Sequence, residues 1–394
     1  MKIGKWAILL LAAASLLAGC KGFWQAPPSG GGGTTTTTLS SGNFYILNKG
    51  TTTSAIYGFS IVSGVLTPMT GNPFPVTGIA SAMAIDSTGS YLYVCGTGGI
   101  YLYDINSSTG ALTQPSSSAI SSDTTGAALA VGAGDNWLLE ASDQGVLNAF
   151  PLTSTGTLNT SGTLQSVALA GTQVQQMALS TNSPLAVLSV ALGTTGTQIF
   201  PFTPAATSKP IGTALPTIAV TSPSSAGASV AVAMDPQNRL MYVGETSAFP
   251  TSSSSGGLRA FTIKATSSAI TLAEISKTPY VSGGTGPHAI TPDSAGDYVY
   301  VGSWQGTSAG LITPFQLTTS GSTYSLAAQT KTTATGDEPF AMAEDNLSHF
   351  MLAVNYLGNP TFDAYIFDTT TTYQLDSTNT DSTASSPIAI LAAP

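Results

Sequence analysis

Charge is scarce in this sequence. Only 7% of the 394 residues are charged, whereas about 25% is usual for globular domains. The net charge is −9, and the ten basic residues include only two arginines, Arg239 and Arg259. Nucleic acids and anionic membrane surfaces are bound through basic patches, so we expect neither as a partner.

Histidine and cysteine are also rare, with two of each in the whole sequence. The histidines lie far apart, and no Walker, dinucleotide-binding or zinc-ligand spacing is present. We therefore expect no metal and no cofactor.

Helical patterning is missing as well, since no stretch of ordinary helix length has an amphipathic period. Apolar residues still make up 42% of the chain, which is too many for a disordered protein. They occur in short runs of β-branched and aromatic residues between Gly, Ser and Thr. This pattern predicts an all-β fold of many short strands.

The first nineteen residues form a predicted signal peptide. Lys2 and Lys5 precede an apolar run over residues 6–18, which is too short for the about twenty residues that a membrane span needs. The run ends in Leu17-Ala18-Gly19-Cys20, which resembles a bacterial lipoprotein signal. We expect residues 1–19 to be removed, Cys20 to be lipidated, and the exported protein to stay anchored at the cell envelope, on a side left open.

Residues 20–41 then form a predicted flexible tether rich in Gly, Thr and Pro. With Cys20 lipidated, Cys95 is the only remaining thiol, so no internal disulfide can form. Cys95 lies in the apolar run "YLYVCG", where we expect a buried structural role.

The rest of the chain, residues 42–394, is built from a repeat. The segment "ASAMAIDSTGSYLYV" aligns without gaps with "SVAVAMDPQNRLMYV", "PHAITPDSAGDYVYV" and "PFAMAEDNLSHFMLA", and two weaker copies lie between them. The six copies begin at Ala80, Gly126, Val174, Ser229, Pro287 and Pro339. Each is followed by an aromatic-rich strand and a short fourth strand, and four strands in roughly 50 residues are typical of a β-propeller blade.

The two ends of the chain complete one further blade. Residues 43–69 carry strands two, three and four of the pattern without strand one, and the last ten residues, "SSPIAILAAP", supply a strand one without its successors. Pairing the two ends would close the ring and protect both sheet edges. The sequence therefore predicts a seven-bladed propeller of four-stranded antiparallel blades.

The segments "YLYV", "MYVG", "YVYVG" and "YILN" resemble the YVTN-type repeats of seven-bladed propellers. Over residues 43–394 the chain resembles the lactonase family of 6-phosphogluconolactonase type. The resemblance implies the propeller fold and, as an activity, lactone hydrolysis.

Blade geometry brings the ends of strand two and the starts of strand one to the same face, here named the loop face. The opposite face, with the turns between strands one and two, is named the turn face. Three of the five glutamates and one of the two histidines fall on the loop face. The polar and aromatic residues expected there are Asn48, Lys49, Glu140, Asp143, Gln173, Glu245, His288, Trp304, Gln305, Asp337, Glu338, Asn355 and Tyr356.

Lactone hydrolysis needs a base for water, a donor or cation for the oxyanion, and contacts for ring hydroxyls. We predict His288, Glu245 and Glu338 as the catalytic group. The predicted substrate contacts are Lys49, Trp304, Gln305, Asn355 and Asn48. The alternative is that these are solvated loop ends, with the two asparagines bonding to backbone. At one turn position Asp86, Asp235, Asp293 and Asp345 recur, where we expect capping of the turn.

The family often carries an Arg-His pair after Gly-Pro, but here Gly286-Pro287 is followed by His288-Ala289. The missing arginine and the export signal disfavour a sugar phosphate. We therefore expect an envelope-anchored, lactonase-like propeller that hydrolyses an unphosphorylated sugar lactone. The alternative is a non-catalytic propeller that binds a ligand, a glycan or a protein at the cell surface. In both cases we expect a monomer.

The lipid anchor can be tested by metabolic labelling with a palmitate analogue. The wild-type protein should incorporate the label, and Cys20→Ser should abolish it, because the thiol is the acceptor. A wild-type protein that is secreted free and unlabelled would contradict the anchor.

Overall fold

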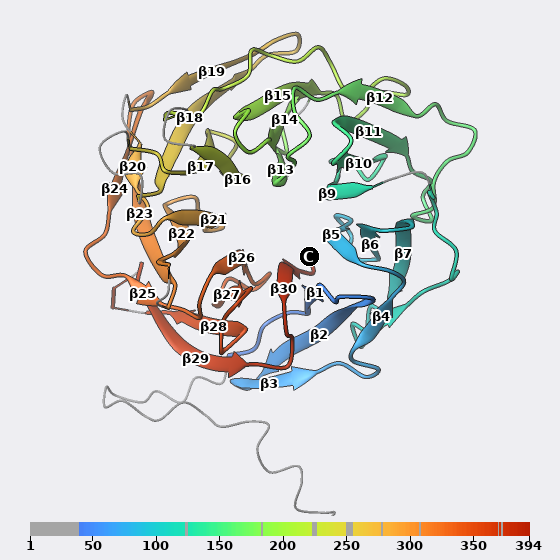
Figure 1. The fold of residues 1–394 in the computed structure, drawn as a ribbon, viewed down its shortest axis with the longest axis horizontal. Coiled ribbons are helices and arrows are strands. Elements are labelled where there is room, and N and C mark those ends of the chain that lie inside the picture. The colour runs from blue at the N-terminus through green and yellow to red at the C-terminus, as the bar shows by residue number, and fades with distance from the viewer. Residues whose placement is uncertain are drawn as a thin grey trace, which may run out of the picture.

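A computed structural model describes residues 39–122, 125–182, 184–222, 227–249, 255–276, 279–306, 309–368, 370–371 and 373–394. The predicted signal peptide and Cys20 lie outside these residues. Seven antiparallel sheets stand around a central axis, as predicted (Figure 1). None of the described segments forms a helix with the length and apolar character of a membrane span.

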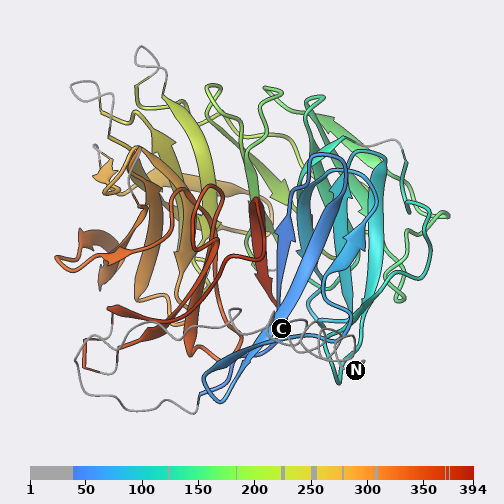
Figure 2. The same ribbon diagram turned by 60° about the horizontal axis from the view of Figure 1, so that its bottom comes forward.

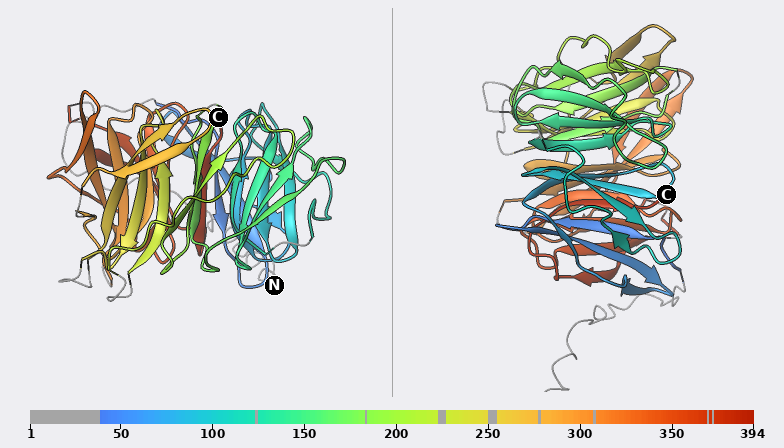
Figure 3. Two further views of the ribbon diagram at one scale, coloured as in Figure 1. Left: turned by 90° about the horizontal axis from the view of Figure 1, so that it is seen from above. Right: turned by 90° about the vertical axis from the view of Figure 1, so that its right-hand side faces the viewer.

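The strands of a blade run across the thickness of the molecule, between its two faces (Figure 3). The innermost strand of each blade borders the axis. These strands are β5 (Ala80–Ile85), β9 (Gly126–Val131), β13 (Gln176–Leu179), β16 (Ala228–Met234), β21 (Gly286–Pro292), β26 (Pro339–Glu344) and β30 (Pro387–Ala392). Six of them begin within one residue of the predicted repeat position, and β13 begins two residues after Val174.

The second strand of each blade is the most buried. The second strands are β1 (Phe44–Asn48), β6 (Tyr91–Gly96), β10 (Trp137–Ser142), β14 (Ala186–Ala191), β17 (Leu240–Thr246), β22 (Tyr298–Trp304) and β27 (Phe350–Asn355). In β1, β10, β14 and β27 every residue is buried, because neighbouring blades cover both faces of the sheet. This burial explains the continuous apolar runs that mark the repeat.

The outer strands complete each sheet. The third strands are β2 (Ser54–Val62), β7 (Gly99–Ile105), β11 (Val146–Pro151), β15 (Thr197–Phe202), β18 (Gly257–Ala265), β23 (Leu311–Ser320) and β28 (Phe362–Phe367). The fourth are β3 (Val65–Pro68), β8 (Leu112–Thr113), β12 (Gln165–Ala168), β19 (Ile270–Glu274), β24 (Thr323–Ala328) and β29 (Leu375–Asp381). Short extra strands β4 (Phe74–Val76), β20 (Tyr280–Val281) and β25 (Thr333–Ala334) pair with β2, β18 and β23.

The blades are numbered 1 to 7 in chain order, from the blade that contains β1 to the blade that contains β26, and in two of them the tyrosine of the repeat ties the blade to the next. The hydroxyl of Tyr45 in blade 1 donates a hydrogen bond to the carbonyl of Gly110 in blade 2, at 2.7 Å. In the same way Tyr93 of blade 2 donates to the carbonyl of Gly156 in blade 3, at 2.8 Å. Each ring fills the space between two sheets while its polar end is satisfied, which suits tyrosine better than phenylalanine.

Blade 4 departs from the prediction. It has three strands, β13, β14 and β15. Over residues 203–218, all of which the structure describes, the chain runs beside β15 with isolated bridges and no ladder. Pro204, Pro210 and Pro216 interrupt this segment, and proline has no N–H to donate to a neighbouring strand. The prediction of four strands in every blade was therefore wrong here.

The recurring aspartates on the turn face cap their turns, as predicted. Each carboxylate accepts a hydrogen bond from the backbone N–H four residues later, and in three of the four cases also from the N–H five residues later. The four residues are Asp86, Asp235, Asp293 and Asp345. Three of the four are buried, and this costs little because backbone donors, together with the Arg239 guanidinium at Asp235, replace the lost water.

The predicted ring closure is confirmed. Strand β30 pairs antiparallel with β1, which sets Phe44 opposite Ala392 and Ile46 opposite Ile390. The blade therefore has the order β3-β2-β1-β30, drawn from both ends of the chain (Figure 1). The residues just before the predicted boundary at residue 42 already pack against this blade, because Ser41 donates its N–H to the carbonyl of Ile61 at 2.9 Å.

Deleting residues 385–394 should test this closure. The loss of β30 would expose the edge of β1 and open the apolar clusters on both of its sides, so the truncated protein should aggregate or melt far below wild type. Removing Pro394 alone, which is exposed, is the matched control and should leave the melting temperature unchanged. Equal melting of the ten-residue deletion and wild type would contradict ring closure as a source of stability.

Candidate functional site

The inner strands surround a central cavity of about 270 Å³. Residues from β5, β9, β16, β21, β26 and β30, together with Gln175, Gln176 and Met177 of blade 4, form its wall. A cavity of this size accommodates a ligand no larger than a small ring compound. The wall of this cavity is therefore the candidate binding and catalytic site.

In six of the seven blades a β-bulge aims one side chain into this cavity. In six blades the pairing between strands one and two shifts register near the loop-face end of the inner strand. A bulge leaves a residue unpaired and redirects its side chain. Together with Gln175 of blade 4, these residues form what we name the channel ring: Ser81, Ala127, Gln175, Val230, His288, Phe340 and Ile388.

His288 is the one titratable side chain among the described residues of the cavity wall. Its imidazole stacks on Phe340, with ring centroids 5.6 Å apart and planes inclined by 13°. Phe340 in turn lies 5.7 Å from the ring of Tyr356. Burial lowers the pKa of His288, because a charged imidazolium is poorly solvated there. At neutral pH the ring is therefore uncharged and able to accept a proton.

Trp304 borders His288 at the end of β22. A side chain on Gly286 would meet the imidazole at 3.0 Å and the Cβ of Trp304 at 3.8 Å, which explains the glycine. The indole Nε1 of Trp304 and the Oδ1 of Asp337 are buried without a hydrogen-bond partner. Trp304 and Asp337 belong to blades 6 and 7, which contribute His288 and Phe340, although other buried polar atoms without a partner lie elsewhere among the described residues.

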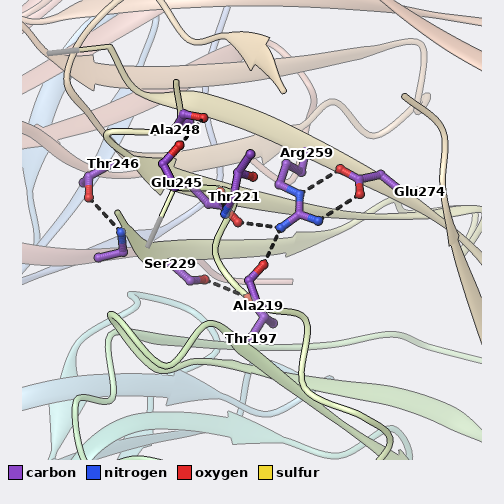
Figure 4. Close-up of polar contacts among 11 residues, drawn as sticks. Thr197, Ala219, Thr221, Ser229, Glu245, Thr246, Ala248, Arg259 and Glu274 are labelled. Carbon is purple, nitrogen blue, oxygen red and sulfur yellow. Dashed lines mark hydrogen bonds and ion pairs between the residues drawn. The ribbon is translucent and has the colours of Figure 1, made fainter. Parts of the chain in front are cut away.

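Glu245 is held in a buried ion pair (Figure 4). Its Oε1 accepts a hydrogen bond from Arg259 at 2.7 Å, and its Oε2 accepts from the backbone N–H of Thr221 at 3.0 Å. Arg259 also binds both oxygens of Glu274 and the carbonyl of Ala219. A buried carboxylate needs such partners, and here they fasten blade 5 to the segment that arrives from blade 4. Glu245 is not part of the cavity wall.

The other charged candidates lie in connections on the loop face and are not part of the cavity wall. Glu338 precedes Pro339 with a backbone φ of 56°, and burial together with the charge of Asp337 raises the pKa of its carboxyl. Burial raises the pKa of Asp143, which follows β10, and the charge of the exposed Lys49 offsets part of that rise. Lys49 is therefore close enough to Asp143 to interact with it.

The remaining predicted substrate contacts hold the loops. Asn48 accepts a hydrogen bond from the N–H of Ser386 at 2.7 Å, and Asn355 binds Asp363 at 2.8 Å and the carbonyl of Pro360 at 3.1 Å. Gln305 donates to the carbonyl of Gly283 at 3.1 Å. These bonds agree with the alternative considered for the asparagines, and binding of a substrate by the three residues stays a prediction.

Two findings concern residues that the sequence did not single out for the site. Phe340 and the polar wall residues Ser81, Gln175 and Gln176 were overlooked, although each lies at, or next to, the position after the start of a repeat. Cys95 is fully buried, and burial followed by the charge of Glu140 raises the pKa of its thiol. This agrees with its predicted structural role.

Comparisons with known proteins support the fold. No family model and no curated protein matches the chain. A solved structure from Bacteroides uniformis, described only provisionally as a 6-phosphogluconolactonase, is 16% identical with a TM-score of 0.67, covering 89% of this chain and 99% of that one. The periplasmic gluconolactonase of Pseudomonas aeruginosa is 14% identical with a TM-score of 0.66, covering 90% and 100%. At these identities the likeness extends to the fold alone, that of a lactonase-like seven-bladed propeller.

Proposed function

We propose that this protein is an exported, lipid-anchored lactone hydrolase whose reaction takes place at His288 in the central cavity. The observation that carries the proposal is one uncharged imidazole in a cavity wall that otherwise has no titratable side chain among the described residues. A general base works best when it is unprotonated at the working pH and reaches the reacting water. The shared fold with a periplasmic gluconolactonase supports the same reading.

The proposed reaction is addition of water to the lactone carbonyl. His288 takes a proton from water as the oxygen bonds to the carbonyl carbon, and the imidazolium then returns a proton to the ring oxygen as the ring C–O bond breaks. The product is a hydroxy acid. Gln176 accepts a hydrogen bond from the N–H of Val232 at 2.9 Å, which fixes its amide and leaves the NH₂ group as a donor for the developing oxyanion.

The cavity favours an unphosphorylated substrate. The described wall has no lysine or arginine, and a phosphate placed there would lose its water without gaining a cation. Ser81 and Gln175 offer neutral partners for ring hydroxyls. Glu338, which precedes β26, is the carboxyl that we retain as a candidate to orient water. Glu245 has no catalytic role in this proposal, because Arg259 and Thr221 occupy its oxygens.

His288→Gln should lower turnover of a neutral sugar lactone on the order of 10²-fold or more, with an almost unchanged melting temperature, because the base is lost while the fold is kept. Asp293→Ala is the control on the turn face, and it should lose stability but keep turnover. The assay is hydrolysis of a panel of neutral and phosphorylated lactones by the mature protein.

The same proteins should be compared across pH. Because burial lowers the pKa of His288 from 6.5, kcat/KM should stay high at pH 6.5 and fall only in more acid solution, where the base becomes protonated. The proposal fails if no lactone is cleaved, or if His288→Gln keeps full turnover, and a non-catalytic binding propeller would then take its place.

Variants of the buried ion pair should lose stability and keep turnover. Arg259→Met leaves Glu245 buried without its cation, so the free energy of unfolding should fall by about 3–5 kcal/mol. Glu245→Gln should cost less, because Arg259 keeps Glu274. The folded fraction of both variants should hydrolyse lactone at a rate close to wild type, as measured after denaturant titration has defined that fraction. A large loss of turnover in stably folded Glu245→Gln would restore a catalytic role for Glu245.

A further inference from the structure

The chain enters the described part of the structure on the turn face, where it is fastened by several bonds. The hairpin tip between β2 and β3 donates two of them, from the N–H of Gly64 to the carbonyl of Leu39 at 2.9 Å and from the N–H of Ser63 to the hydroxyl of Ser40 at 3.1 Å. His349 Nδ1 lies 2.8 Å from the carbonyl of Ser40. Leu39 therefore has a fixed position between blades 1 and 7.

Exposed apolar side chains surround this point. Val62 and Val65 flank the hairpin tip that holds Leu39 and Ser40, and they are 50% and 60% exposed. Leu347, which is 48% exposed, precedes His349 by two residues in the turn of blade 7. These three residues, named the apolar rim, are half of the large exposed hydrophobic side chains of the described structure. In Figure 2 the blue hairpin of β2 and β3 reaches the lower edge of the molecule.

We propose that the apolar rim docks onto the surface of the lipid bilayer that holds the anchor, so that the turn face meets the membrane and the channel ring faces water. This proposal rests on the lipid anchor of the proposed function, but not on the hydrolysis. The bilayer is the expected partner because the predicted lipid anchor is near: Leu39 lies nineteen positions after Cys20.

A tether of this length keeps the rim close to the bilayer. Nineteen residues span at most about 65 Å when extended, and roughly 25 Å as a flexible coil. The anchor thus turns docking into an intramolecular event, for which even a small contact is enough. Three half-exposed aliphatic side chains make such a contact, which is too weak to hold an unanchored protein. With a net charge of −9, the attraction is apolar and not electrostatic.

The orientation suits the cavity. The channel ring lies at the loop-face end of the inner strands, whereas β30 ends on the turn face, where Pro394 lies against Gly89. Docking through the turn face therefore leaves the mouth beside His288 open to soluble ligands. Docking through the loop face would cover it.

The test uses full-length, lipidated protein in vesicles of zwitterionic phospholipid that contain a quenching lipid. A dye is attached through Thr67→Cys, beside Val65 on the turn face, or through Thr51→Cys on the loop face. Both threonines are exposed, while Cys95 is fully buried and should not react. The dye at position 67 should be quenched by the lipid and the dye at position 51 should not.

Matched variants then test the apolar rim itself. Replacing Val62, Val65 and Leu347 with Ser should lower the ratio of docked to undocked protein on the order of tenfold or more. Replacing the other three exposed hydrophobic residues, Leu164, Val281 and Leu357, with Ser should leave it unchanged. If the rim variant melts below wild type, Val65→Asn alone repeats the comparison.

Equal quenching at positions 67 and 51 would overturn the proposal, as would full docking of the rim variant. A wild-type chain that carries no lipid and floats free of the vesicles would overturn it too, together with the anchor. Turnover of lactone in solution does not depend on these outcomes, so failure of docking and failure of hydrolysis are distinguishable.

Discussion

The structure depends on the antiparallel pairing of β30 with β1. This contact joins residues 339 to 348 positions apart and converts a row of sheets into a closed ring. Each blade then has a neighbour on both sides, so the second strands can be buried along their whole length. Closure also brings seven inner strands around one axis, and the bulges of those strands point their side chains at a common cavity.

Scarcity of charge makes the position of each charged group informative. The buried carboxylates of Asp86 and Asp345 are satisfied by backbone N–H groups. Asp235 is satisfied by a backbone N–H and the Arg239 guanidinium, and Glu245 by Arg259 and the N–H of Thr221. These four carboxylates are thus used to hold the fold. The described wall of the cavity is neutral apart from the potential of His288 to take a proton. A neutral wall favours a neutral ligand and leaves His288 as the one side chain of the described wall that can take up a proton.

The features of the fold that recur from blade to blade could be predicted from the sequence, whereas features confined to a single blade could not. The blade number, the shared first blade and the capping aspartates follow from patterns that recur every 46 to 58 residues. Blade 4 has no fourth strand because three prolines interrupt the segment after β15. An alignment of the repeats does not include that segment. Glu245 was grouped with His288 because both lie near the ends of strands on one face. Glu245 instead forms an ion pair with Arg259 of β18 and is not part of the cavity wall. The spacing of residues in the sequence does not predict such a contact. Phe340 was missed because an aromatic residue in an apolar strand is normally expected in the hydrophobic core. Only the β-bulge in the structure shows that its side chain lines the cavity.

The most direct measurement uses the fact that the protein has only two histidines, His288 and His349. In a protein with labelled imidazoles, NMR should show two signals, which His288→Gln assigns. The account predicts that His288 titrates below pH 6.5 and shifts when a neutral sugar lactam is added, since the lactam keeps the ring carbonyl but resists hydrolysis. The signal of His349, which lies on the turn face beside Ser40, should not respond to the lactam. A His288 signal that ignores every such ligand, or that titrates above pH 6.5, would contradict the assignment of the central cavity as the site.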